Sequence, residues 1–88
     1  MTKQDFIVCM KIINAYYLDW QFNFNDKTQV ETWYQYLQGM GFAKLKSVIN
    51  YYMSKNDKGP NSPRDLLRAR YEYELKSKIH GNSEANDV

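Results

Sequence analysis

The feature that most constrains this fold is the spacing of apolar residues, which recur every three or four positions in four segments of the chain. This spacing predicts helices over residues 2–18, 26–38, 42–55 and 62–79. Between the first two helices, aromatic residues alternate with polar ones, which is the period of a strand. This run is too short for a strand, and the chain has no second run that could pair with it. The sequence therefore predicts an all-α fold. We expect one small four-helix bundle-like domain over residues 1–80 and a short, flexible and disordered C-terminal tail over residues 81–88.

Residues that favour helix ends lie at the starts and ends of these segments. A side-chain oxygen at the residue before a helix accepts a hydrogen bond from a free backbone N–H of the first turn. Three starts fit this pattern, namely Thr2 with Asp5, Asp26 with Gln29, and Ser62 followed by Pro63 and Asp65. Gly39 and Gly41 are expected to supply the positive-φ positions that end the second helix. Gly81 is expected to end the fourth.

Composition narrows the class of protein. The chain has 88 residues with a formal charge of +2, and 43% of its residues are apolar. This apolar content is enough for one hydrophobic core and is higher than in a disordered chain. A single cysteine, Cys9, excludes an intramolecular disulfide. No apolar run is long enough to span a bilayer, and the polar start is not a signal peptide. We therefore expect an intracellular, soluble protein that makes no contact with a membrane.

No group of residues in the sequence has the pattern of a catalytic or metal site. His80 is the only histidine and has no partner at the spacing of zinc ligands. Cys9 lies in the apolar stripe of the first helix, where a small core residue is the simpler interpretation. Gly39 and Gly41 lack the following Lys and Ser or Thr of a phosphate-binding loop. We expect no enzymatic activity, no cofactor, no metal and no small-molecule substrate.

Two groups of side chains are candidates for a contact surface. The first is aromatic: Tyr16, Tyr17, Trp20, Phe22 and Phe24. They either fill one end of the bundle or leave one or two rings exposed as binding anchors. The second group, at the start of the fourth helix, consists of Arg64, Arg68, Arg70, Tyr71 and Tyr73. Arg and Tyr are enriched at binding hot spots, although a solvated helix face has a similar composition.

The order of several core and cap residues resembles a known family, the small phage-encoded loaders and inhibitors of the replicative helicase. The resemblance covers about residues 6–67. It rests on Trp33, Tyr34 and Leu37, then Phe42, Val48, Tyr51 and Tyr52, then Pro60, Ser62, Asp65 and Leu66, with the opening helix ending at Ala15 to Tyr17. Two features differ from the family. Lys58, Gly59 and one proline replace a hydrophobic residue before paired prolines, and the tail after the fourth helix is shorter than in loaders.

The resemblance implies an all-helical adaptor of phage DNA replication that binds the host helicase loader ATPase or the replicative helicase. Because the tail is short, we expect inhibition or hijacking of the loader by stoichiometric contact. Arg64, Arg68, Arg70, Tyr71 and Tyr73 are the expected partner-binding residues, with Trp20 and Phe22 as secondary candidates. The alternative is a small DNA-binding regulatory protein of helix-turn-helix type. The segment between the last two helices is longer than the turn of that motif, so a nucleic acid is not the expected partner.

Overall fold

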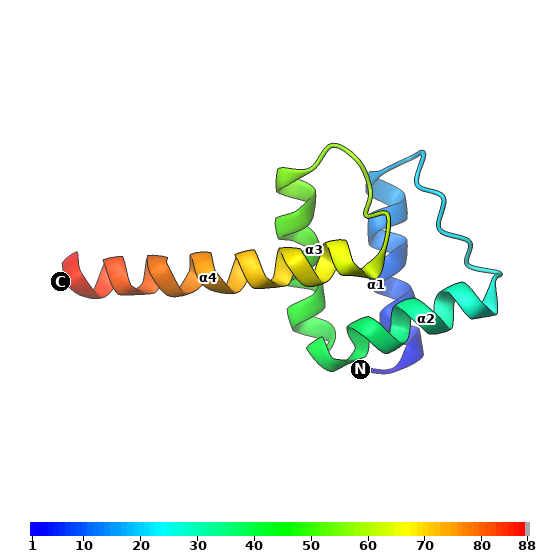
Figure 1. The fold of residues 1–88 in the computed structure, drawn as a ribbon, viewed down its shortest axis with the longest axis horizontal. Coiled ribbons are helices and arrows are strands. Elements are labelled where there is room, and N and C mark those ends of the chain that lie inside the picture. The colour runs from blue at the N-terminus through cyan, green and yellow to red at the C-terminus, as the bar shows by residue number, and fades with distance from the viewer. Residues whose placement is uncertain (88) are drawn as a thin grey trace.

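The structure, a computed structural model, describes the backbone of residues 1–87 and the side chains of residues 1–77. Its helices are α1 (Lys3–Tyr16), α2 (Lys27–Leu37), α3 (Phe42–Lys55) and α4 (Pro63–Asp87), with a short 3₁₀ turn, η1 (Gln38–Met40), after α2 (Figure 1). No strand occurs among the described residues. The predicted all-α fold is therefore confirmed.

The helices form two layers. α1 and α3 lie side by side and run in the same direction, while α2 and α4 lie across them (Figure 1). α4 contacts both α3 and α2 near its start and then continues beyond the other helices. The core lies between the layers and is formed by the predicted apolar positions. The side chains with no exposed surface are Phe6, Cys9, Met10, Ile13, Leu37, Leu45, Val48, Ile49, Leu66 and Pro60.

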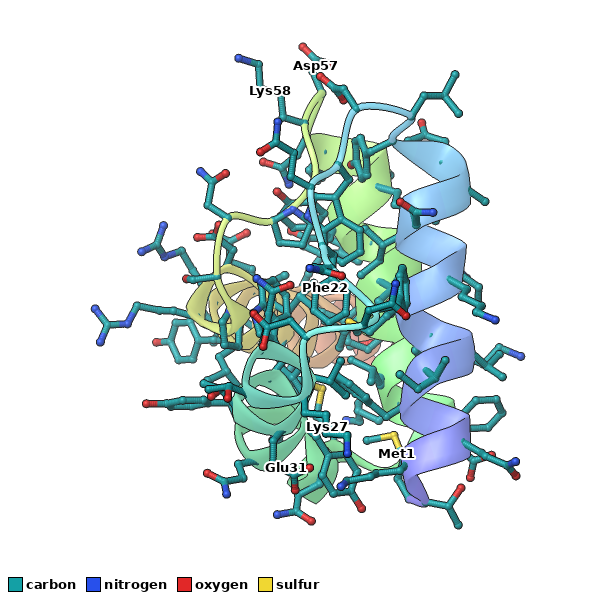
Figure 2. All side chains as sticks on the ribbon, turned by 90° about the vertical axis from the view of Figure 1, so that its right-hand side faces the viewer. Met1, Phe22, Lys27, Glu31, Asp57 and Lys58 are labelled. Carbon is teal, nitrogen blue, oxygen red and sulfur yellow. The ribbon has the colours of Figure 1, made fainter. Side chains whose placement is uncertain are left out.

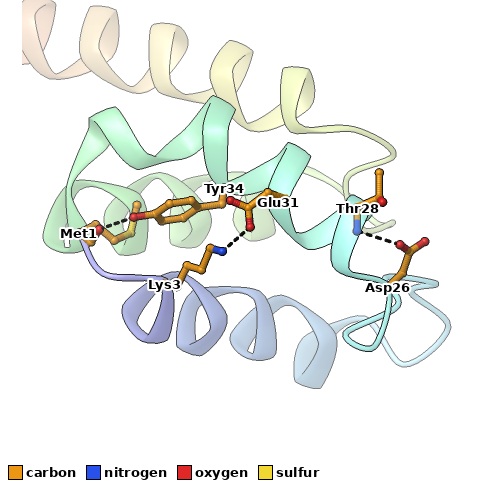
Figure 3. A network of polar contacts seen from close by, with 6 residues as sticks. All are labelled: Met1, Lys3, Asp26, Thr28, Glu31 and Tyr34. Atoms are coloured by element: carbon orange, nitrogen blue, oxygen red, sulfur yellow. Dashed lines mark hydrogen bonds and ion pairs between the residues drawn. The ribbon is translucent and has the colours of Figure 1, made fainter.

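Polar contacts join the first residues of the chain to α2 (Figure 3). The Tyr34 hydroxyl donates a hydrogen bond of 2.8 Å to the backbone carbonyl of Met1. Beside it, Lys3 forms an ion pair with Glu31. Both are part-exposed, so the ion pair contributes little to stability. The Tyr34 bond matters more, because it ties a backbone group near α1 to a helix of the other layer.

The first two caps agree only in part with the sequence predictions. Thr2 and Asp5 form the expected capping box at the start of α1. The Asp26 carboxylate accepts hydrogen bonds from the N–H groups of Thr28 and Gln29, as expected. The Gln29 side chain does not return to Asp26. Its Oε1 accepts instead from the N–H of Asn23, at 2.6 Å, and so holds the preceding loop.

The turn after α2 corrects one prediction. Gly41 has a φ of 81°, as expected, but it is the only described glycine with a positive φ, so the prediction for Gly39 is wrong. The reason is that the chain does not turn at Gly39. At Gly39 the chain forms the 3₁₀ turn η1, whose backbone conformation any residue can adopt. The chain then changes direction at Gly41, the residue after η1.

At the start of α4, Pro63 and Asp65 agree with the prediction, whereas the cap predicted at Ser62 is not confirmed, because the N–H of Asp65 donates to the Ser62 backbone carbonyl and not to its side chain. The end of α4 differs from the prediction. Pro63 is the first helical residue, and the Asp65 carboxylate accepts from the N–H of Asn61 at 2.9 Å. The helix continues past Gly81 to Asp87, because a glycine inside a helix costs only about 1 kcal/mol relative to alanine. The predicted flexibility of residues 81–88 stays a prediction. The side chains of residues 78–88, His80 among them, lie outside the described residues.

Candidate protein-binding surface

The aromatic residues between α1 and α2 fill one end of the bundle. Tyr17 and Phe22 are buried, and Trp20 is half-buried. The Trp20 and Phe22 rings stack with centroids 5.0 Å apart, and the edge of Phe22 meets Trp33 at 5.2 Å. Figure 2 shows Phe22 pointing into the molecule. Phe22 is therefore buried inside the fold and not exposed as an anchor, whereas Trp20 keeps part of its surface exposed. A role of Trp20 or Phe22 in partner binding stays a prediction.

The segment between α3 and α4, residues 56–62, lies against these aromatic side chains. Three of its backbone carbonyls accept hydrogen bonds from aromatic donors. The Tyr17 hydroxyl donates to Asn56, the Tyr52 hydroxyl to Lys58 and the Trp20 indole Nε1–H to Pro60, each at 2.8 Å. On the other side of the same segment, Asp57 and Lys58 point away from the bundle (Figure 2). The segment is thus a fixed part of the fold.

Opposite faces of α4 have different roles. Leu66 and Ala69 are buried in the core, and Tyr73 packs edge-on against Tyr51 at 5.9 Å. Arg64, Arg68 and Tyr71 follow one another at i, i+4 and i+7, which places them on the solvent side. Leu75 continues this row at i+11, so the row spans both charged and apolar side chains. Tyr71 is 66% exposed and Leu75 is 42% exposed.

Arg70 and Tyr73 lie apart from that row. The Arg70 Nε donates to Glu74 Oε1 at 2.6 Å, and Lys44 approaches the same carboxylate. The hydrogen bond from Arg70 lowers the pKa of Glu74. Among the described residues, Arg64 and Arg68 form no ion pair. The five predicted residues are therefore not one cluster, because Arg70 is engaged by Glu74 and Tyr73 belongs to the core edge.

We call Arg64, Arg68, Tyr71 and Leu75 the outer α4 face. Leu75 is not among the residues that the sequence analysis predicted for partner contact. Its spacing of four from Tyr71 would have placed it on the exposed row. Two guanidinium groups without an ion-pair partner among the described residues lie next to an exposed tyrosine, and Arg and Tyr are enriched at the hot spots of protein interfaces. Leu75 adds apolar surface beside them. The arrangement is suited to contact with another protein.

Other parts of the described chain offer less for chemistry. No group of three or more His, Cys, Asp or Glu side chains that could hold a metal ion occurs among the described residues. Of the described helices, none is long and apolar enough to cross a membrane. The Cys9 thiol is buried in the core, and burial raises its pKa to about 11.

The burial of Cys9 predicts an unreactive thiol. In the folded protein at pH 8, a maleimide or disulfide reagent is expected to leave Cys9 unmodified, because the thiolate is both scarce and inaccessible. Denatured protein is expected to react completely within the same time. Mass spectrometry of the two samples measures the difference. Rapid labelling of the folded protein would show that the core around α1 opens readily.

A comparison with protein-family models finds one match that covers most of the chain. The model described as "G39P, N-terminal domain" matches residues 1–66. No curated protein and no solved structure matches. The matched region contains α1, α2, α3, the segment 56–62 and the first turn of α4. It therefore includes Arg64 and ends before Arg68, Tyr71 and Leu75.

Proposed function

The chain belongs to the G39P N-terminal domain family, the N-terminal domain of a phage gene 39 protein that inhibits helicase loading; from this membership we propose that it binds the host helicase loader ATPase or the replicative helicase. It is a phage replication protein related to helicase loading and acts in the host cell. We further propose that it acts in the cytoplasm, by stoichiometric contact and without catalysis, and that it inhibits or hijacks the loader.

The observation that supports a binding role is the outer α4 face. Arg64 and Arg68 have no ion-pair partner among the described residues, and Tyr71 and Leu75 keep much of their surface in water. These side chains do not pack in the core, so they are available for contact with a partner. A partner that covers them gains apolar burial and charge-assisted hydrogen bonds together. The proposed partner therefore meets the protein along α4.

Binding to DNA by a helix-turn-helix is the weaker candidate. That motif joins its helices by a turn of about three or four residues. Here α3 ends at Lys55 and α4 begins at Pro63, and the segment between them is buried at Pro60 against aromatic side chains. Among the described side chains of α4, Arg70 is engaged by Glu74, which leaves Arg64, Arg68 and Lys76 as the basic side chains outside that pair. This geometry favours a protein as the partner.

The proposed function predicts a selective loss of partner capture. Tagged wild-type protein is expected to recover the loader ATPase or the replicative helicase from a lysate of the host, identified by mass spectrometry. The double substitution Arg68→Ala and Tyr71→Ala removes two hot-spot residue types and is expected to weaken capture by roughly 30-fold or more. Helicity and thermal stability are expected to stay near wild type, because both side chains are exposed. Equal capture by the variant would remove α4 from the contact.

A further inference from the structure

The three hydrogen bonds to residues 56–60 come from three different parts of the fold. Tyr17 closes α1, Trp20 lies in the segment after it, and Tyr52 belongs to the last turn of α3. Their acceptors are the carbonyls of Asn56, Pro60 and Lys58, which alternate along the segment. We name the three donors the aromatic clamp. We propose that the clamp positions the outer α4 face, by fixing the direction in which α4 leaves the bundle.

Packing inside the segment adds to the clamp. Pro60 is fully buried. A Cβ atom on Gly59 would lie 2.4 Å from Cδ1 of the Trp20 ring, so the Gly59 backbone touches the indole directly. Burial also raises the pKa of Tyr17 to about 12, in agreement with its place inside the fold. The segment is held both by donors and by close contact with a ring.

The segment is joined directly to α4, so restraint of the segment also restrains the start of this helix. Pro63 starts the helix directly after it, and the Asp65 carboxylate accepts from the N–H of Asn61 across the junction. Among the described residues, the apolar contacts of α4 with the core lie at residues 66–73, and farther along the helix Glu74 pairs with Lys44 and Lys76 lies over the Tyr51 ring. At 1.5 Å per residue, Leu75 lies about 18 Å along the helix from Pro63. A rotation of α4 at its junction with the segment therefore displaces Leu75, which lies beyond these apolar contacts, more than Arg64, which lies next to the junction.

A partner that contacts the whole row from Arg64 to Leu75 needs this direction to be constant. A helix that swings would spend part of its time in directions in which only one end of the row meets the partner, and binding would then have to order it. Tyr17, Trp20 and Tyr52 act as positioning residues, since they would contribute to affinity without touching the partner. This consequence for affinity rests on the proposed function. The effect of the clamp on α4 does not.

The test removes donors while keeping the rings. Tyr17→Phe and Tyr52→Phe each delete one hydroxyl. Tyr34→Phe is the matched control, because its hydroxyl makes an equal 2.8 Å bond to a carbonyl outside the segment. Each lost neutral hydrogen bond shifts a local equilibrium by a factor of about five. Exchange of the Asn61 and Asp65 amide protons, followed by NMR, is expected to be about 5-fold faster in each single variant and about 25-fold faster in the double variant.

The direction of α4 is measured separately. Spin labels at Lys11→Cys in α1 and Ser77→Cys in α4 occupy exposed sites, and buried Cys9 stays unlabelled. Double electron–electron resonance is expected to give one narrow distance distribution for the wild type and the Tyr34→Phe control. A broader or shifted distribution is expected for the Tyr17→Phe and Tyr52→Phe double variant. Should the double variant fail to fold, the single variants are expected to show the same change at smaller size.

Two results would contradict the proposed role of the aromatic clamp. An unchanged distance distribution in a folded clamp variant would show that α4 is held by its core contacts alone. The same broadening in Tyr34→Phe would show general loosening of the bundle. Neither result depends on a partner, so each separates this inference from the proposed function. Conversely, a wild-type protein that captures neither helicase nor loader would contradict the proposed function and leave the distance result unaffected.

Discussion

Leu66→Ala is expected to lower the free energy of unfolding by about 3 kcal/mol, the largest effect of any single substitution considered. Leu66 is fully buried and lies within the short stretch by which α4 contacts the core. Its truncation removes apolar surface from the core and leaves a cavity that rigid neighbours fill only in part. For a domain with a total stability of roughly 5–10 kcal/mol, this is a large share. Urea unfolding followed by circular dichroism measures the difference.

Leu75→Ala is the matched control on the same helix. Leu75 is 42% exposed, and its truncation is expected to change stability by less than about 0.5 kcal/mol. The same substitution is expected to weaken partner binding, because Leu75 belongs to the outer α4 face. Equal losses of stability in Leu66→Ala and Leu75→Ala would contradict the assignment of the two faces of α4.

Gly59→Ala is expected to lower the free energy of unfolding by about 2–3 kcal/mol, the second largest effect. The new methyl group would stand 2.4 Å from Cδ1, 2.8 Å from Cγ and 3.0 Å from Nε1 of Trp20. These atoms belong to a ring, and the ring is held by its stack on Phe22 and by its bond to Pro60. Neither side can yield easily, so the segment must move off the aromatic clamp.

Gly39→Ala is the control for Gly59→Ala. No atom lies within 4 Å of a Cβ built at Gly39, and the residue does not have a positive φ. Replacement of such a glycine by alanine restricts the unfolded chain and is expected to be neutral or to stabilise by about 0.5 kcal/mol. Urea unfolding of both variants, with the Trp20 and Trp33 fluorescence as the signal, gives the comparison. A mild effect of Gly59→Ala would show that the segment is loosely held.

Local patterns predicted much of this fold. Apolar spacing placed α3 at its observed bounds and α1 within two residues of them, and the cap residues Thr2 and Asp26 act as expected. Of the aromatic group, Tyr17 and Phe22 fill one end of the bundle, whereas Tyr16 is 58% exposed. The helix bounds and the caps follow from interactions within a few residues along the chain, where spacing and residue type determine which groups meet.

The polar contacts that the sequence analysis did not predict join residues both near each other and far apart in the chain. Gln29 bonds to Asn23 and not to Asp26 because the preceding loop folds back on α2. Arg70 does not join the predicted cluster, because it forms an ion pair with Glu74, which Lys44 of α3 also approaches. The bonds from Tyr17 to Asn56 and from Trp20 to Pro60 each join residues about 40 positions apart. Periodicity shows which face of a helix is apolar, and it does not show which polar group meets it.

Isothermal titration calorimetry of the protein with the purified host helicase loader ATPase, and separately with the replicative helicase, tests the central claim most directly. The account predicts binding to one of the two at a fixed molar ratio, and a loss of that binding in the folded Arg68→Ala and Tyr71→Ala variant. Absence of binding to both proteins by folded wild type would contradict the proposed function. Undiminished binding by the variant would contradict the role of the outer α4 face.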